Sequence, residues 1–146
     1  MVSQHNCNNI LLLLKICMMI RFSIKQHFKV SAEILYAAWL NSAQNSIMTG
    51  GNAIITDYMY KSFSAWDGYI SGTNTHLVKY KKIVHWWRTA EFKEQDKDSK
   101  ITITFENNSD GCLLTLEHTN ISKGQSDYEK YWQKDYLSPM MEYFNN

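Results

Sequence analysis

The sequence has 146 residues, 45% of them apolar, and its 15 Lys and Arg nearly balance 14 Asp and Glu. A domain of this length buries roughly two thirds of its unfolded surface, and a formal net charge of +1 gives no basic footprint for nucleic acid or an anionic membrane. Aromatic residues make up 14% of the chain, enough to fill a thick core or to line a cavity for an apolar ligand. The composition therefore predicts one domain that binds no nucleic acid.

The first 20 residues differ from the rest, because a polar opening is followed by an apolar run at residues 10–20 that only Lys15 interrupts. This run is too short for stable insertion across a bilayer, and it lacks the flanking features of a signal peptide. We expect residues 1–20 to be an extension of the domain at 21–146, with a start of translation at Met18 or Met19 as one hypothesis. Three cysteines without a CxxC pair indicate no disulfide framework or zinc ribbon and favour a reducing, cytoplasmic location.

The first elements are predicted to be one strand and two short helices. Residues 21–29 alternate between apolar and polar side chains, which is typical of a half-buried strand. Ser31 is placed to cap a helix that runs to about residue 40, and residues 41–49 form a second helix that ends at Gly50-Gly51.

The middle of the chain is predicted to form strands joined by tight turns. Asp67-Gly68, between two apolar runs, is a strong hairpin signal. A polar loop at residues 92–100 and a turn at residues 108–111 separate the later strands. The predicted strands are residues 52–57, 60–66, one that begins at Tyr69, 73–78, 82–89, 99–107 and 112–120.

Residues 125–144 form the only long amphipathic helix in the prediction. Ser126 and Glu129 have the spacing of a capping box, and Pro139 is expected to kink the helix or to end its regular part. The element order predicts an α+β fold in which a curved antiparallel sheet of about six to seven strands wraps around this helix. One face of the helix carries Tyr128, Trp132, Tyr136, Pro139 and Tyr143.

Three segments carry a resemblance to a known family: residues 63–74 (FSAWDGYISGTN), residues 81–92 (KKIVHWWRTAEF) and residues 118–144. They resemble the C-terminal domain of the activator of the ninety-kilodalton heat-shock chaperone's ATPase, in its stand-alone form within the START-like, helix-grip superfamily. The resemblance covers about residues 22–144. It implies a cavity between the sheet and the C-terminal helix, closed by the two short helices. Tyr60-Lys61 and Tyr131 replace glycines usual in the family, which should stiffen one cavity edge.

The strand at residues 82–89 carries the polar residues of greatest interest. With Glu91, either His85 or Arg88 is a possible polar anchor at the cavity. The interpretation that we favour is an ion pair between Arg88 and Glu91, with His85 as a surface or satisfied core histidine. We expect most of the aromatic candidates to be core residues. The candidate cavity residues are Trp39, Phe63, Trp66, Tyr69, His85, Trp87, Arg88, Trp132 and Tyr136.

No metal, cofactor or catalytic residue is predicted. His85, His118 and Cys112 would form a metal site only if their strands were neighbours, and their spacing does not support one. The usual sequence-visible catalytic devices are missing: the Ser/His/Asp elbow, the phosphate-binding glycine loop and the helical HExxH motif.

Three functions follow from the resemblance and the residues together. The first hypothesis is a non-catalytic domain that binds a small apolar ligand between the sheet and the C-terminal helix. The alternative is a cochaperone that binds the ninety-kilodalton heat-shock chaperone and stimulates its ATPase. The third is an enzyme of the cyclase or hydrolase kind, which would use His85, Arg88 or Glu91.

Overall fold

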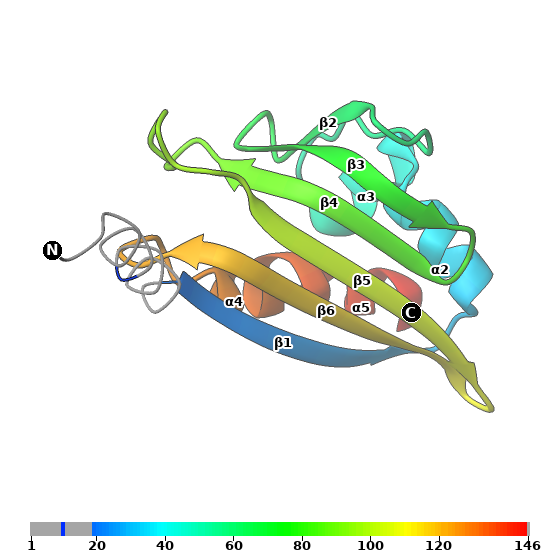
Figure 1. Ribbon diagram of the computed structural model, residues 1–146. Helices are drawn as coiled ribbons and strands as arrows, with labels where there is room; N and C mark the ends of the chain where they lie inside the picture. The colour runs from blue at the N-terminus through cyan, green and yellow to red at the C-terminus, as the bar shows by residue number, and fades with distance from the viewer. Residues whose placement is uncertain (1–9, 11–18, 146) are drawn as a thin grey trace, which may run out of the picture.

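The structure, a computed structural model, describes residue 10 and residues 19–145, so the predictions for the rest of the N-terminal extension lie outside the described residues. Six antiparallel strands form one sheet in the order β1-β6-β5-β4-β3-β2 (Figure 1). The strands are β1 (Met19–Phe28), β2 (Ser62–Ala65), β3 (Ile70–Val78), β4 (Lys82–Thr89), β5 (Ser99–Asn108) and β6 (Gly111–Ser122). The helical segments are α2 (Ala32–Trp39), α3 (Ser42–Thr49), α4 (Tyr128–Tyr131), η1 (Trp132–Leu137) and α5 (Ser138–Asn145).

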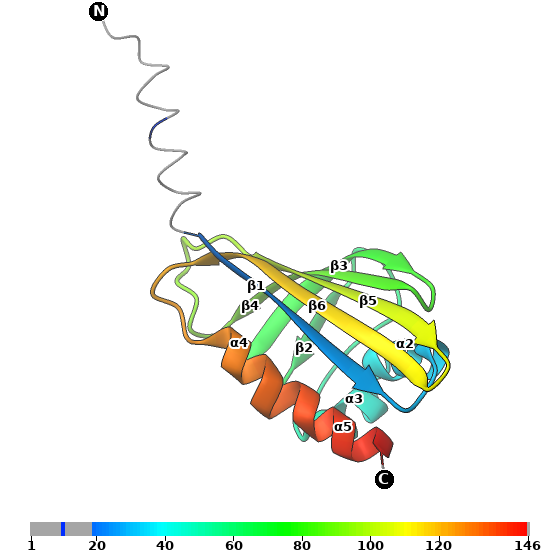
Figure 2. The same cartoon turned by 90° about the horizontal axis from the view of Figure 1, so that it is seen from below.

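The sheet has an inner face that meets the helices and an outer face that is more exposed. In β4, for example, Ile83, His85 and Trp87 are buried on the inner face, while Trp86 on the outer face is 41% exposed. Both views place α2, α3 and the C-terminal helical segments on the same side of the sheet (Figures 1 and 2). The core therefore lies between the inner face and these helices, as the predicted helix-grip fold requires.

The two short helices begin and end as predicted. The Ser31 side chain accepts a hydrogen bond from the Ile34 amide and caps α2, and Asn41 caps α3 through the Gln44 amide. Gly50 has a φ of 81°, the left-handed conformation that commonly ends a helix.

The prediction of a strand at residues 52–57 was wrong. Only Ile54 pairs with the sheet, in a single bridge to Ser64. Its neighbours bond to α3 instead: the Ala53 amide donates to Ser46 Oγ, and the Ile55 amide and carbonyl both bond to Ser42 Oγ. The segment therefore lies as a strap between α3 and the edge of the sheet.

The hairpin at Asp67-Gly68 is confirmed, but the strands around it differ in length from the prediction. β2 is shorter than residues 60–66, and β3 runs without a break from Ile70 through the separate strand expected at residues 73–78. The Tyr69 amide donates to the Trp66 carbonyl across the turn, and the two central residues, Asp67 and Gly68, both have positive φ, as a type I′ turn between strands with a right-handed twist requires.

The C-terminal helix differs from the prediction in its cap and in its regularity. Asp127, rather than Ser126, caps the first turn by accepting from the Lys130 amide. Pro139 lies inside α5, and the irregular part is the π-helical segment η1 that precedes it. The Gln133 carbonyl there accepts from both the amide and the hydroxyl of Ser138, which closes the wide π-helical turn. None of the helices in the described part of the chain has the length and apolar character needed to cross a membrane.

Candidate functional site

A group of aromatic side chains fills the space between the sheet and the C-terminal helix. The rings of Trp39 and Trp132 stack with centroids 6.2 Å apart, and Tyr136 lies 5.0 Å from Trp39. From the sheet, the Phe63 ring lies 4.4 Å from the His85 ring. The small cavity left between them is lined by Trp39, Ile55, Phe63, Ala65, Ile70, His85, Trp87, Trp132 and Tyr136.

This inner cavity is almost completely filled by its own side chains. The centre of a water molecule has about 10 Å³ available there, which is the room for roughly one water. Pockets for drug-sized ligands are about 300–1,000 Å³. Five of the aromatic residues that the sequence suggested as cavity lining are therefore packed as core: Trp39, Phe63, Trp87, Trp132 and Tyr136.

His85 leaves one hydrogen-bond donor unused in this filled interior. Trp39 Nε1 donates to His85 Nε2 over 3.3 Å, so the proton of the neutral ring is on Nδ1. Among the described residues, His85 Nδ1 is buried without a partner. Burial lowers the pKa of His85 to about 3. An acceptor that entered the inner cavity would find this donor free.

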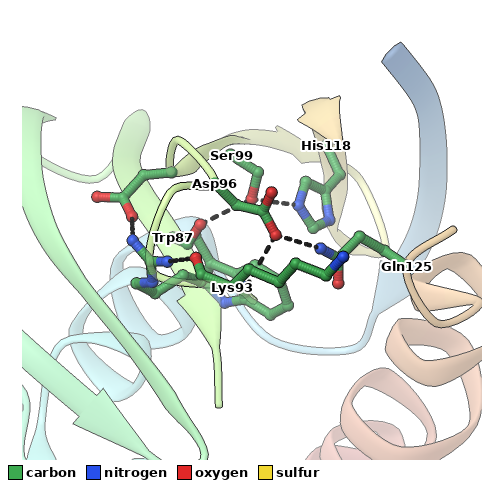
Figure 3. Close-up of polar contacts among 8 residues, drawn as sticks. Trp87, Lys93, Asp96, Ser99, His118 and Gln125 are labelled. Carbon is green, nitrogen blue, oxygen red and sulfur yellow. Dashed lines mark hydrogen bonds and ion pairs between the residues drawn. The ribbon is translucent and has the colours of Figure 1, made fainter. Parts of the chain in front are cut away.

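His118, by contrast, has both ring nitrogens occupied. Trp132 Nε1 donates to His118 Nδ1 over 3.1 Å, so Nε2 carries the proton and donates to Ser99 Oγ over 2.8 Å. The Ser99 hydroxyl in turn donates to the Trp87 carbonyl (Figure 3). Burial lowers the pKa of His118 to about 3. Because its Nε2 donates to the serine, this histidine is in the wrong tautomer to act as that serine's base.

The metal site considered from the sequence does not form in the described part of the chain. The lone pair of His118 Nδ1 accepts the Trp132 proton, and Cys112 is buried as a free thiol. No group of three or more His, Cys, Asp or Glu side chains that could hold a metal ion occurs among the described residues.

Tyr136 joins the C-terminal helix to α3 by a buried polar contact that the sequence did not suggest. Asn45 Nδ2 donates to the Tyr136 hydroxyl and to the Trp39 carbonyl, each over 3.0 Å. Burial raises the pKa of Tyr136. The contact spans 91 positions of sequence, so no local pattern indicates it.

Removing the Tyr136 hydroxyl should destabilise the domain. In Tyr136→Phe, one donor of the buried Asn45 amide loses its acceptor, and we expect the free energy of unfolding to fall by about 1–2 kcal/mol. Urea denaturation measures this change. Tyr143→Phe, at a ring that is exposed, is the matched control and should change the stability little. Equal stability of the two variants would contradict the assignment of this hydrogen bond.

The other three predicted residues do not line the inner cavity. Trp66 is in the hairpin turn, and its ring lies 6.3 Å from Tyr131. Tyr69 donates its hydroxyl to Glu91 over 2.7 Å. Arg88 forms an ion pair with Asp98 at 2.9 Å.

The expected ion pair between Arg88 and Glu91 was therefore wrong. The guanidinium of Arg88 bonds to Asp98 and to the Lys93 carbonyl, both in the loop that follows β4. Glu91 accepts hydrogen bonds from Tyr69 and Ser126 instead, and these lower its pKa. Ser126 is thus used in this contact rather than as a helix cap. Among the described residues, no hydrogen bond or ion pair joins His85, Arg88 and Glu91 into one site.

A larger depression lies outside the core, and we call it the outer groove. It lies among the α2–α3 connection, the strap at residues 55–57 and the turn between β3 and β4, and has a volume of about 730 Å³. Its walls include Tyr36, Leu40 and Tyr80. Ile55 lines both the outer groove and the inner cavity. The strap therefore lies between a groove of ligand size and the cavity that His85 lines. No sequence pattern indicated this groove.

A curved antiparallel sheet packed on a C-terminal helix, with two short helices after the first strand, defines a START-like helix-grip domain. A family model described as "Activator of Hsp90 ATPase homolog 1-like protein" matches residues 29–145, and the chain belongs to this family. No curated protein matches the sequence.

Solved structures share the fold. An HSP90 activator from Plasmodium falciparum is 22% identical, with a TM-score of 0.75 over 88% of this chain and 96% of that chain. A protein from Mesorhizobium loti is 13% identical, with a TM-score of 0.74 over 86% and 97%. The Aha1 dimer from Colwellia psychrerythraea is 12% identical, with a TM-score of 0.70 over 86% and 94%. At these identities the likeness concerns the fold.

Proposed function

We propose that this protein is a non-catalytic, cochaperone-type domain that binds an Hsp90-type chaperone and stimulates its ATPase. The observation that carries the proposal is a set of exposed apolar side chains beside the short edge strand β2, which we call the apolar edge. Its residues are between 47% and 77% exposed, and they come from α3 and from the segment between α3 and β2, a concentration of apolar side chains that is typical of a binding surface. The apolar edge consists of Ile47, Ile54, Tyr58, Met59 and Tyr60.

The backbone beneath the apolar edge is held in place by one buried residue. Asn74 Nδ2 donates to the carbonyls of Thr56 and Tyr58, over 2.8 and 3.1 Å. The Tyr60 amide donates to the Asn74 carbonyl, and the Asn74 amide donates to the Lys61 carbonyl. Rings that are presented on a fixed backbone lose little conformational entropy when they bind. This preorganisation supports a role in protein recognition.

Residue types support the same proposal. Tyrosine and methionine are enriched at protein–protein interfaces, and both are prominent in the apolar edge. Membership of the family and the fold shared with the Plasmodium falciparum HSP90 activator supply the class of partner. The inner cavity, with room for roughly one water, favours recognition by the surface over storage of a ligand.

The proposal predicts stimulation of the host's own Hsp90 ATPase by an excess of purified domain. A double variant, Tyr58→Ser with Tyr60→Asn, should weaken the apparent affinity about thirtyfold or more, because two interface aromatics of this kind contribute at least about 1 kcal/mol each. Asparagine suits position 60 because Tyr60 has a φ of 61°, a conformation that asparagine tolerates.

Trp86→Ala, which removes an exposed ring from the outer face of β4, is the control and should stimulate as the wild type does. No effect of the wild-type domain on ATPase turnover would contradict the proposed function. Stimulation that the double variant retains in full would instead show that the partner binds elsewhere on the domain.

Small-ligand binding is a second candidate, favoured by one specific observation. His85, whose Nδ1 is the unused donor, lines the inner cavity, and Ile55 lines both this cavity and the outer groove. A ligand would have to displace Ile55. The Ile55 amide donates to Ser42 Oγ, and the Ser42 hydroxyl donates to the Ile55 carbonyl, each over 2.9 Å. This candidate requires the strap to open, and it predicts a ligand that remains bound during purification.

A further inference from the structure

The outer groove carries chemistry that neither chaperone binding nor the inner cavity uses. Its volume of about 730 Å³ lies within the range of about 300–1,000 Å³ typical of small-molecule sites. Leu40 and Ile55 give it an apolar wall, and Tyr36 and Tyr80 give it aromatic ones. Lys79 and Tyr80, in the turn between β3 and β4, line it as well.

Tyr36 is the fixed part of this groove. Its ring packs edge-on against Tyr80 and against Phe105, with both pairs of ring centroids 5.7 Å apart. The side chain is only 7% exposed. No hydrogen bond joins its hydroxyl to any described residue, and the hydroxyl is not among the fully buried polar atoms that lack a partner, so it faces solvent and can bond to a molecule in the groove. Burial, followed by the nearby charge of Asp57, raises the pKa of Tyr36, which keeps the hydroxyl a neutral donor.

The rim of the outer groove carries one charge of each sign. Asp57 and Lys79 both line it, and neither takes part in an ion pair, since the ion pair found among the described residues joins Arg88 and Asp98. The Lys79 ammonium lies 5.1 Å from the centroid of the Tyr80 ring. An exposed contact of this kind contributes about 0.5–1 kcal/mol, so an incoming carboxylate can readily attract Lys79 away from the ring.

These charges restrict the ligands that suit the groove. A molecule with a single positive charge is attracted by Asp57 but repelled by Lys79, and a molecule with a single negative charge meets the reverse. A molecule that carries both charges on an apolar body can form an ion pair with each of the two side chains while its body packs against the apolar and aromatic walls. We propose that the outer groove binds a small zwitterion with an apolar or aromatic body, of the amino-acid class, with its ammonium toward Asp57 and its carboxylate toward Lys79.

Three probes that share a phenyl body test this proposal: phenylalanine as the zwitterion, phenethylamine as the cation and phenylpropanoate as the anion. Each is titrated at pH 7 into the isotopically labelled protein, and amide chemical shifts report both the site and the affinity. Phenylalanine should bind saturably and shift the amides of Asp57, Lys79 and Tyr80. Its affinity should exceed that of either singly charged probe by up to about tenfold, because it gains one exposed ion pair and avoids one repulsion.

Two exposed substitutions separate the charges. In Asp57→Asn, phenylpropanoate should bind about as well as phenylalanine, because the repulsion of its carboxylate is gone. In Lys79→Gln, phenethylamine should reach the affinity of phenylalanine for the same reason. Absence of saturable shifts at the groove, or a charge preference that both variants leave unchanged, overturns the proposal. Stimulation of the chaperone ATPase should persist in both variants, so failure of this inference is distinguishable from failure of the proposed function.

Discussion

Replacement of Gly72 by alanine should destabilise the domain by at least about 3 kcal/mol, the upper range for overpacking a core. Gly72 lies in β3 opposite Phe63 of β2. A methyl group there would collide with the Trp86 carbonyl of the neighbouring strand and lie 2.8 Å from the Phe63 ring. Because the carbonyl belongs to the backbone of the sheet, strands β3 and β4 would have to separate. Urea denaturation of Gly72→Ala measures the loss.

Gly124→Ala is the control for this substitution. Nothing lies within 4 Å of its added methyl group, and the cost comes only from a φ of 90°, about 1–2 kcal/mol. The comparison separates steric collision from backbone strain. A Gly72→Ala protein within about 1 kcal/mol of the wild type would contradict the close packing of Phe63 over this glycine.

Acid should destabilise the domain through its two buried histidines. His85 and His118 have pKa values of about 3 in the folded protein, lowered by burial, against about 6.5 in an unfolded chain. Between these values the unfolded state binds more protons, so the free energy of unfolding falls as the pH falls below 6.5. From pH 7 to pH 5 we expect a loss of about 2 kcal/mol for each histidine, on the order of 4 kcal/mol together.

Urea denaturation at a series of pH values between 6.5 and 4.5 tests this dependence. The slope near pH 5 should correspond to nearly two protons taken up on unfolding, and in His85→Gln it should fall to about one. His76→Gln, which removes an exposed imidazole, is the matched control and should leave the slope unchanged. A stability that is flat over this window would show that neither buried histidine stays neutral in the folded protein.

Local patterns in the sequence predicted the helices, whose hydrogen bonds are local, and the strands whose apolar and polar side chains alternate. Strand β1 contains the predicted residues 21–28, because the buried Ile24 and Phe28 alternate there with more exposed side chains. The prediction of a strand at residues 52–57 was wrong because alternate amides of this segment bond to Ser42 and Ser46 of α3. An extended segment has the same sequence pattern whether a strand or a helix supplies its hydrogen-bond partners. The prediction that Ser126 caps the C-terminal helix was wrong because its hydroxyl bonds to Glu91.

The candidate site was predicted in its residue types but not in its geometry. Trp39, His85 and Trp132 do meet in the interior, since a buried face shared by a strand and a helix can be identified from periodicity. How much space remains between them depends on rotamers and on the strap, which periodicity does not encode. The partners of Arg88 and Tyr136 were not predicted either, because loop geometry and a contact 91 positions apart decide them.

The measurement that tests the account most directly is native mass spectrometry of the protein purified from its own source, compared with its denatured mass. A filled core predicts a native mass equal to the chain alone, or to the chain with a retained chaperone, because the inner cavity has about 10 Å³ of free space. A reproducible extra mass of roughly a few hundred daltons, the size of ligands that fill drug-sized pockets, would contradict this prediction and favour small-ligand binding, in the outer groove or in an inner cavity that the strap opens to admit it.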